Sequence, residues 1–153
     1  MHYSLYFHIP FCVHRCAYCD FNTYAGQETL IPDYVDALCR EIRYLAESAP
    51  QRLTAHTLFF GGGTPSLLSS FQFETILKVT RDCFDLTQDA EISLEANPGT
   101  VSFDSLRDLH GFGFNGPYQH ILSFNGKEGF VELDAVVNAI FDITNVNILG
   151  ITP

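Results

Sequence analysis

Three cysteines stand close together near the amino terminus, at Cys12, Cys16 and Cys19. The C-x3-C-x2-C spacing lets a single loop surround one centre with three thiolates, and thiolates are the ligands that iron–sulfur clusters require. A four-iron cube with only three protein ligands keeps one iron open to a substrate or a cofactor. The pattern therefore predicts chemistry at an open iron rather than plain electron storage.

Two plainer interpretations of the cysteine run are three buried thiols and a zinc site completed by His8 or His14. Zinc sites usually take two pairs of ligands, and no second pair is present because Cys39 and Cys83 stand singly on predicted helices. We interpret those two cysteines as small apolar core residues. An odd total of five cysteines, clustered in this way, also does not suit the disulfide framework of a secreted protein.

Residues 61–66 read GGGTPS and stand between a predicted strand and a predicted helix. Backbone N–H and C=O groups are bare there, so a ligand could approach them closely. The segment lacks the lysine of a phosphate-binding P-loop, and Ser66 replaces the last glycine of a dinucleotide-binding fingerprint. A tight turn with no ligand is the alternative.

Glu95 ends a predicted strand and points, by alternation, to the face opposite Ile92 and Leu94. A carboxylate there could accept hydrogen bonds from an ammonium group or from ribose hydroxyls. A solvated glutamate at a strand end is the more ordinary alternative. Tyr6 and His8 alternate in the same way on the first strand, where they could line a pocket or pack under a helix.

Strand and helix patterns alternate along the chain that carries these residues. Apolar residues alternate over 3–9, and helical spacing follows over 31–49. A strand over 56–60 then precedes a helix that opens with a capping box at Ser69 and Gln72.

A third cycle consists of a strand at 92–96 and a short helix over 103–109. Weaker signals continue the rhythm, with a strand at 121–124, a helix over 133–141 and a strand at 146–151. Such alternation predicts an α/β fold with a parallel sheet, either open or partly closed as a barrel. Loops that follow its strands share the edge where α/β proteins place ligands. The cysteine run, the glycine segment and Glu95 should meet at this edge.

Composition narrows the class of partner. The 153 residues suit one domain, and a formal net charge of −10 disfavours binding to nucleic-acid phosphates. No run approaches the ~20 apolar residues of a membrane span. We therefore expect a soluble, cytoplasmic protein whose partners are small molecules or proteins, with no nucleic acid and no membrane span among its features.

Four segments resemble, in order, the motifs of the radical S-adenosylmethionine family. They are residues 6–12 (YFHIPFC), 18–21 (YCDF), 60–66 (FGGGTPS) and 94–100 (LEANPGT). The likeness is closest to the group of oxygen-independent coproporphyrinogen III oxidases and haem chaperones. It implies a partial (β/α)6 barrel in which Cys12, Cys16 and Cys19 hold a 4Fe-4S cluster, and S-adenosylmethionine chelates the open iron.

The resemblance also implies which residues contact S-adenosylmethionine, and it assigns no catalytic side chain. The matching positions are Tyr6, Tyr18, Gly62, Gly63, Thr64 and Glu95. In the family's chemistry, an electron from the reduced cluster cleaves the sulfonium to methionine and a 5′-deoxyadenosyl radical, which abstracts hydrogen from a substrate.

Phe21 distinguishes the two branches of this group, because the oxidases carry a further cysteine at that place. It favours the haem-chaperone branch. The partners implied are haem or a porphyrinogen, a haem-accepting protein and an electron donor. An active coproporphyrinogen oxidase and a catalytically inactive cluster-binding fragment are the alternatives.

The resemblance weakens after about residue 115. Leu122 occupies the place of a glutamine, and Asn147 that of an aspartate. We expect the chain to lack counterparts of the last barrel strands and of the C-terminal domain. We expect residues 1–153 to be the N-terminal part of a single radical SAM core domain with a divergent segment at 116–153. The chain would then be a fragment of a longer product or a degraded copy that needs a partner.

Overall fold

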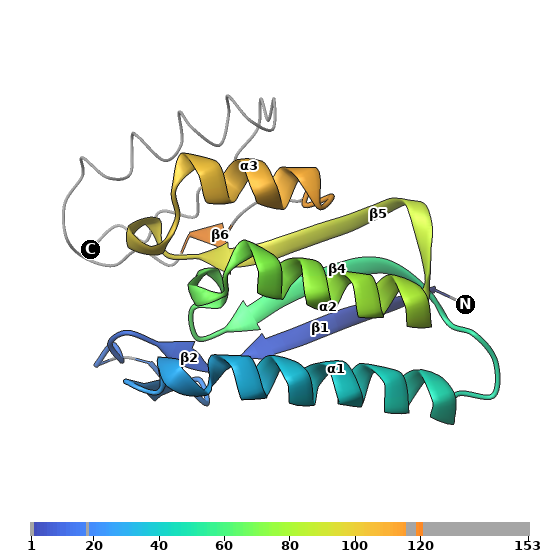
Figure 1. Ribbon diagram of the computed structural model, residues 1–153, viewed down its shortest axis with the longest axis horizontal. Coiled ribbons are helices and arrows are strands. Elements are labelled where there is room, and N and C mark those ends of the chain that lie inside the picture. Colours follow the sequence, from blue (N-terminus) through green and yellow to red (C-terminus); the bar gives the residue numbers. More distant parts are fainter. Residues whose placement is uncertain (1, 18, 116–118, 121–153) are drawn as a thin grey trace.

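A computed structural model describes residues 2–17, 19–115 and 119–120, which form a parallel sheet with helices packed on one face (Figure 1). The sheet has the strand order β1-β4-β5-β6, and every neighbouring pair is parallel. Its strands are β1 (His2–Ile9), β4 (Thr54–Gly62), β5 (Asp85–Ala96) and β6 (Gln119–His120). The predicted α/β fold with parallel strands is confirmed.

Helices connect successive strands of the sheet. They are α1 (Ile31–Ser48), α2 (Ser70–Cys83) and α3 (Phe103–Gly111). The predicted capping box of α2 is present, because the Ser69 hydroxyl accepts from Gln72 N while the Gln72 side chain accepts from Ser69 N. Three single turns of 3-10 helix precede these helices at Glu28–Leu30 (η1), Pro65–Leu67 (η2) and Pro98–Thr100 (η3).

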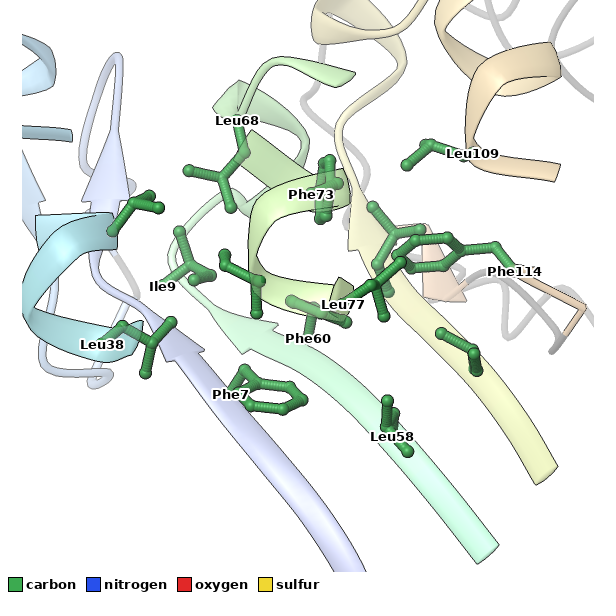
Figure 2. Close-up of a cluster of buried hydrophobic side chains, with 14 of the residues drawn as sticks. Phe7, Ile9, Leu38, Leu58, Phe60, Leu68, Phe73, Leu77, Leu109 and Phe114 are labelled. Atoms are coloured by element: carbon green, nitrogen blue, oxygen red, sulfur yellow. The ribbon is translucent and has the colours of Figure 1, made fainter. Parts of the chain in front are cut away.

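A hydrophobic core fills the space between the sheet and the helices (Figure 2). Three fully buried phenylalanines meet near its centre: Phe60 of β4, Phe73 of α2, and Phe114, which follows α3. Their ring centroids lie 5.4–5.5 Å apart. Full burial of one such side chain contributes about 1.5–3 kcal/mol, so this cluster fixes α2 and the end of α3 against the strand that leads into the glycine segment. Cys39 is buried and Cys83 packs partly buried against this core, as predicted.

Several element boundaries differ from the sequence prediction. β4 does not stop at Gly61, because His8 and Ile9 of β1 continue to pair with Gly61 and Gly62. Phe84, the residue after α2, has extended backbone, and Phe103 at the start of α3 is exposed. The elements predicted at 121–124, 133–141 and 146–151 lie outside the described residues. In the described part of the chain, none of the helices has the length and apolar character needed to cross a membrane.

Arg52 joins the end of α2 to the start of β5. Its guanidinium donates to the carbonyl oxygens of Arg81, Asp82 and Phe84 at 3.0, 2.8 and 3.2 Å. It also forms an ion pair with Asp85 at 2.6 Å. These carbonyls belong to the helix end, where hydrogen-bond partners are lacking and a positive charge is favourable.

Arg52→Ala should lower the free energy of unfolding by about 1–2 kcal/mol. The substitution removes several charge-assisted hydrogen bonds at once, and their effect is moderated because the arginine side chain is half-exposed. Urea denaturation followed by circular dichroism measures this. The control is Arg40→Ala, an exposed arginine of α1, which should change stability by less than about 0.5 kcal/mol. Equal effects of the two substitutions would contradict the assigned capping role.

Candidate functional site

The cysteine loop, residues 13–23, leaves the carboxyl edge of the sheet and is closed at its base by a short strand pair. β2 (Phe11–Cys12) pairs in parallel with β3 (Tyr24–Ala25). Tyr24 N donates to Pro10 O at 2.7 Å, and Gly26 N donates to Cys12 O at 3.3 Å. Both ends of the loop are therefore fixed, and Cys12 is held by the strand pair itself.

The three cysteines differ in their exposure. Cys12 is buried, Cys16 is exposed, and Cys19 is intermediate between them. Within the loop, Cys19 N donates to Cys16 O at 3.0 Å, and the Arg15 guanidinium donates to Cys19 O at 3.2 Å. A local turn thus links the backbones of Cys16 and Cys19, while the β2–β3 strand pair positions Cys12.

The glycine segment packs directly against Cys12. Gly63 N donates to Ile9 O and Thr64 N to Phe11 O, each at 2.7 Å. The Thr64 hydroxyl lies 3.7 Å from the Cys12 Sγ, to which it donates. A Cβ on Gly63 would lie 3.0 Å from this sulfur and 2.6 Å from Phe11 O, so any larger residue would push the two loops apart.

Gly62 connects this segment to Glu95 at the end of β5. Its backbone N–H donates to Glu95 Oε2 at 3.0 Å. Gly62 has φ of +119°, which side-chain-bearing residues rarely adopt, and a Cβ there would lie 2.6 Å from His8 Nδ1. The exposed backbone that the sequence predicted is therefore used here to hold a carboxylate.

Tyr6 and His8 project from β1 on the face opposite the helices, beside Glu95. The Tyr6 ring stacks on Phe59 with centroids 5.8 Å apart, and its hydroxyl lies 3.2 Å from His8 Nδ1. Tyr6 remains 56% exposed. The helices among the described residues, α1, α2 and α3, cover the other face, so within this part of the chain Tyr6 and His8 do not pack under a helix.

Burial governs the electrostatics of Glu95 and Tyr6. It raises the pKa of Glu95 above its ordinary value, and the Gly62 hydrogen bond and nearby His8 only partly oppose the rise. The pKa of Tyr6 is raised by burial and, to a smaller degree, by the negative charge of Glu95. A cationic group bound beside Glu95 would relieve the cost of its charge.

A polar cluster missed by the sequence interpretation ties the glycine segment to the loop after β5. The buried Ser66 hydroxyl accepts from Asn97 N at 3.0 Å and lies 2.5 Å from the Thr100 hydroxyl. Thr100 in turn donates to Asn97 O at 2.8 Å. Asparagine ahead of Pro-Gly is typical of a side-chain-capped turn, and this signal could have located the cluster.

Three thiolates are the kind of donor set that iron–sulfur clusters use. No three His, Cys, Asp or Glu side chains of the described residues converge closely enough to hold one ion. The thiolates of a four-iron cube each bind a different iron and stand farther apart than the ligands of one zinc. His8 is also engaged through both ring nitrogens, with Tyr6 and with Asn22 O, which argues against its use as a zinc ligand.

Most of the residues predicted for the site are brought together at the carboxyl edge of β1, β4 and β5. Direct contacts link Thr64 to Cys12 and Gly62 to Glu95, and Gly63 packs on Cys12. Tyr6 lies beside the same loop, within 3.2 Å of where a Gly61 Cβ would stand. Tyr18 lies outside the described residues.

Comparison with known proteins places this arrangement in a family. A model of the radical SAM superfamily matches residues 6–142. The heme chaperone HemW of Escherichia coli is 46% identical over 113 residues, which cover 73% of this chain and 30% of HemW. An oxygen-independent coproporphyrinogen III oxidase of Synechocystis is 33% identical, with 95% of this chain and 34% of the relative covered.

The fold has a solved counterpart as well. Coproporphyrinogen III oxidase (HemN) from Escherichia coli, described as a radical SAM enzyme, superposes with a TM-score of 0.80 at 32% identity over 90% of this chain and 34% of that one. The chain thus spans about a third of the length of these relatives. Its sequence motifs, its parallel sheet and a family match over most of its length agree: this chain belongs to the radical SAM superfamily.

Proposed function

We propose that this chain binds a 4Fe-4S cluster through Cys12, Cys16 and Cys19 and binds S-adenosylmethionine beside it. The observation that carries the proposal is the packing of Gly63 and Thr64 on Cys12, with Glu95 held on the adjacent Gly62. One stretch of glycine backbone thus joins the cysteine loop to the carboxylate of Glu95. When bound, the cluster and the sulfonium nucleotide supply one-electron chemistry.

The residues of the chain position and shield these groups. The Thr64 hydroxyl donates toward the Cys12 sulfur, and hydrogen bonds to cluster sulfurs tune the reduction potential. One carboxylate oxygen of Glu95 accepts a hydrogen bond from Gly62 N. The other oxygen can accept from an ammonium group or a hydroxyl. The Tyr6 ring packs against Gly61 and stacks on the ring of Phe59.

We further propose that the chain serves haem handling of the heme-chaperone type, with haem or a porphyrinogen, a haem-accepting protein and an electron donor as partners. Phe21 occupies the position where the oxidases carry an additional cysteine. Identity is 46% to the heme chaperone of Escherichia coli over 113 residues and 33% to the oxidase of Synechocystis over 159 residues, while two other heme chaperones match at 34–36%. Residues 1–153 would form part of a single radical SAM core domain, with 116–153 as its divergent segment.

Two assays on the anaerobically reconstituted chain test this function. We expect haem to bind, seen as a shift of its Soret band, and 5′-deoxyadenosine to form when dithionite and S-adenosylmethionine are added. Decarboxylation of coproporphyrinogen III would instead favour the oxidase. Cluster and S-adenosylmethionine binding without 5′-deoxyadenosine would favour the inactive fragment, and failure to hold iron would overturn all three.

Glu95→Gln should weaken S-adenosylmethionine binding by about tenfold or more, because a hydrogen bond to a charged group is worth about 1.5–3 kcal/mol. The same change should stabilise the protein without its cofactors at pH 8. The folded-state pKa of Glu95 is raised, so its contribution to stability is present below the ordinary glutamate pKa and is lost as the pH rises through the folded value.

Equilibrium dialysis and thermal unfolding between pH 4 and pH 8 measure the two effects of Glu95→Gln. The stability gain should disappear at the acid end, where both side chains are neutral. Glu91→Gln, an exposed glutamate on the same strand, is the matched control. A Glu95→Gln protein that binds as tightly as wild type and is less stable at pH 8 would contradict both roles.

A further inference from the structure

The His8 ring lies between the cysteine loop and the Tyr6 side chain, and it has no role in the function proposed above. Its Nε2 is 3.0 Å from Asn22 O, near the end of the cysteine loop. Its Nδ1 is 3.2 Å from the Tyr6 hydroxyl in the pocket. The ring also occupies the space beside Gly62, where a Cβ would approach Nδ1 to 2.6 Å and Cε1 to 2.7 Å.

The partners of the ring determine its tautomer. A carbonyl oxygen can only accept, so Nε2 carries the hydrogen that Asn22 O receives. In the neutral ring Nδ1 is then an acceptor, and the Tyr6 hydroxyl donates to it. Each nitrogen therefore serves a different half of the site, one through a backbone carbonyl and the other through a side chain.

The ring also constrains the glycine segment. The N–H of Gly62 donates to Glu95, and its backbone conformation favours glycine. The His8 ring fills the space into which a side chain at this position would project. The backbone of His8 is anchored in turn, because its carbonyl oxygen accepts from the Tyr34 hydroxyl of α1. His8 is thus anchored to α1 and contacts both the cysteine loop and the glycine segment.

We propose that His8 is a positioning residue that couples the cysteine loop to the S-adenosylmethionine pocket. Its Nε2–H restrains the cysteine loop at Asn22, and its Nδ1 orients the Tyr6 hydroxyl beside Gly62 and Glu95. The part of this inference that concerns the cluster and S-adenosylmethionine rests on the proposed function. The restraint of the loop is a property of the protein alone.

Two substitutions separate the nitrogens. His8→Gln places an amide N–H near the position of Nε2 and removes the acceptor for Tyr6. His8→Asn places an amide oxygen near the position of Nδ1 and removes the donor to Asn22. His2→Asn is the control, because His2 lies on the same strand and on the same face at its far end.

Hydrogen exchange on the protein without cofactors reads the loop directly. Amides of residues 13–23 should exchange about threefold to tenfold faster in His8→Asn, as expected for one lost hydrogen bond, and stay near wild type in His8→Gln and His2→Asn. On the reconstituted protein, His8→Asn should lose iron to a chelator faster by a similar factor. His8→Gln should raise the dissociation constant for S-adenosylmethionine about threefold to tenfold.

Equal effects of His8→Gln and His8→Asn on loop exchange, or no effect of either, would overturn the proposal and leave His8 as a packing residue. Reconstitution that fails in wild type while the exchange pattern appears as expected would refute the cofactor assignment and not the loop restraint. The exchange measurement thus distinguishes failure of this inference from failure of the proposed function.

Discussion

The close approach of the glycine backbone to the cysteine loop is the constraint on which the site depends. Gly63 lies where any Cβ would meet the Cys12 sulfur, and Gly62 lies where any Cβ would meet the His8 ring. Two parallel strands deliver these residues, because His8 and Ile9 of β1 pair with Gly61 and Gly62 of β4. Interior packing resists displacement, so a side chain at either glycine would separate the thiol loop from the carboxylate pocket.

The charge of Glu95, at the end of β5, is unfavourable for folding. Burial raises the pKa of Glu95, so its charge costs folding free energy near neutral pH. The hydrogen bond from Gly62 N–H offsets part of this unfavourable free energy, and a bound cation would offset more of it. Such a carboxylate has little value to the fold itself, which instead relies on the phenylalanine cluster under β4 and on the Arg52 contacts at the end of α2.

The sequence predicted well those features that arise from local periodicity. Alternation of apolar residues located β1, and capping-box spacing located the start of α2. The glycine segment was assigned to a loop, yet Gly61 and Gly62 extend β4, because pairing with β1 is a tertiary effect that glycine propensity does not report. The gathering of Cys12, Gly62 and Glu95 at one edge followed from parallel topology alone.

Contacts between residues distant in sequence could not be predicted in this way. The bridge from His8 of β1 to Asn22 of the cysteine loop, and the link from Ser66 of η2 to Thr100 of η3, each depend on how two separate segments lie in space. The roles of Tyr6 and His8 stayed open for the same reason, since alternation gives the face of a strand and not what covers it. The β2–β3 pair that closes the cysteine loop is too short to leave a periodic signal.

The proposed function depends on three thiolates that hold a four-iron cluster whose fourth iron has no protein ligand. Mössbauer spectroscopy of the chain reconstituted with iron-57 tests it most directly. We expect S-adenosylmethionine to change the spectrum of one iron of the four, and we expect alanine in place of Cys12, Cys16 or Cys19, but not of Cys83, to abolish the cluster signal. Zinc in place of iron, or four irons that all stay unchanged when S-adenosylmethionine is added, would contradict it.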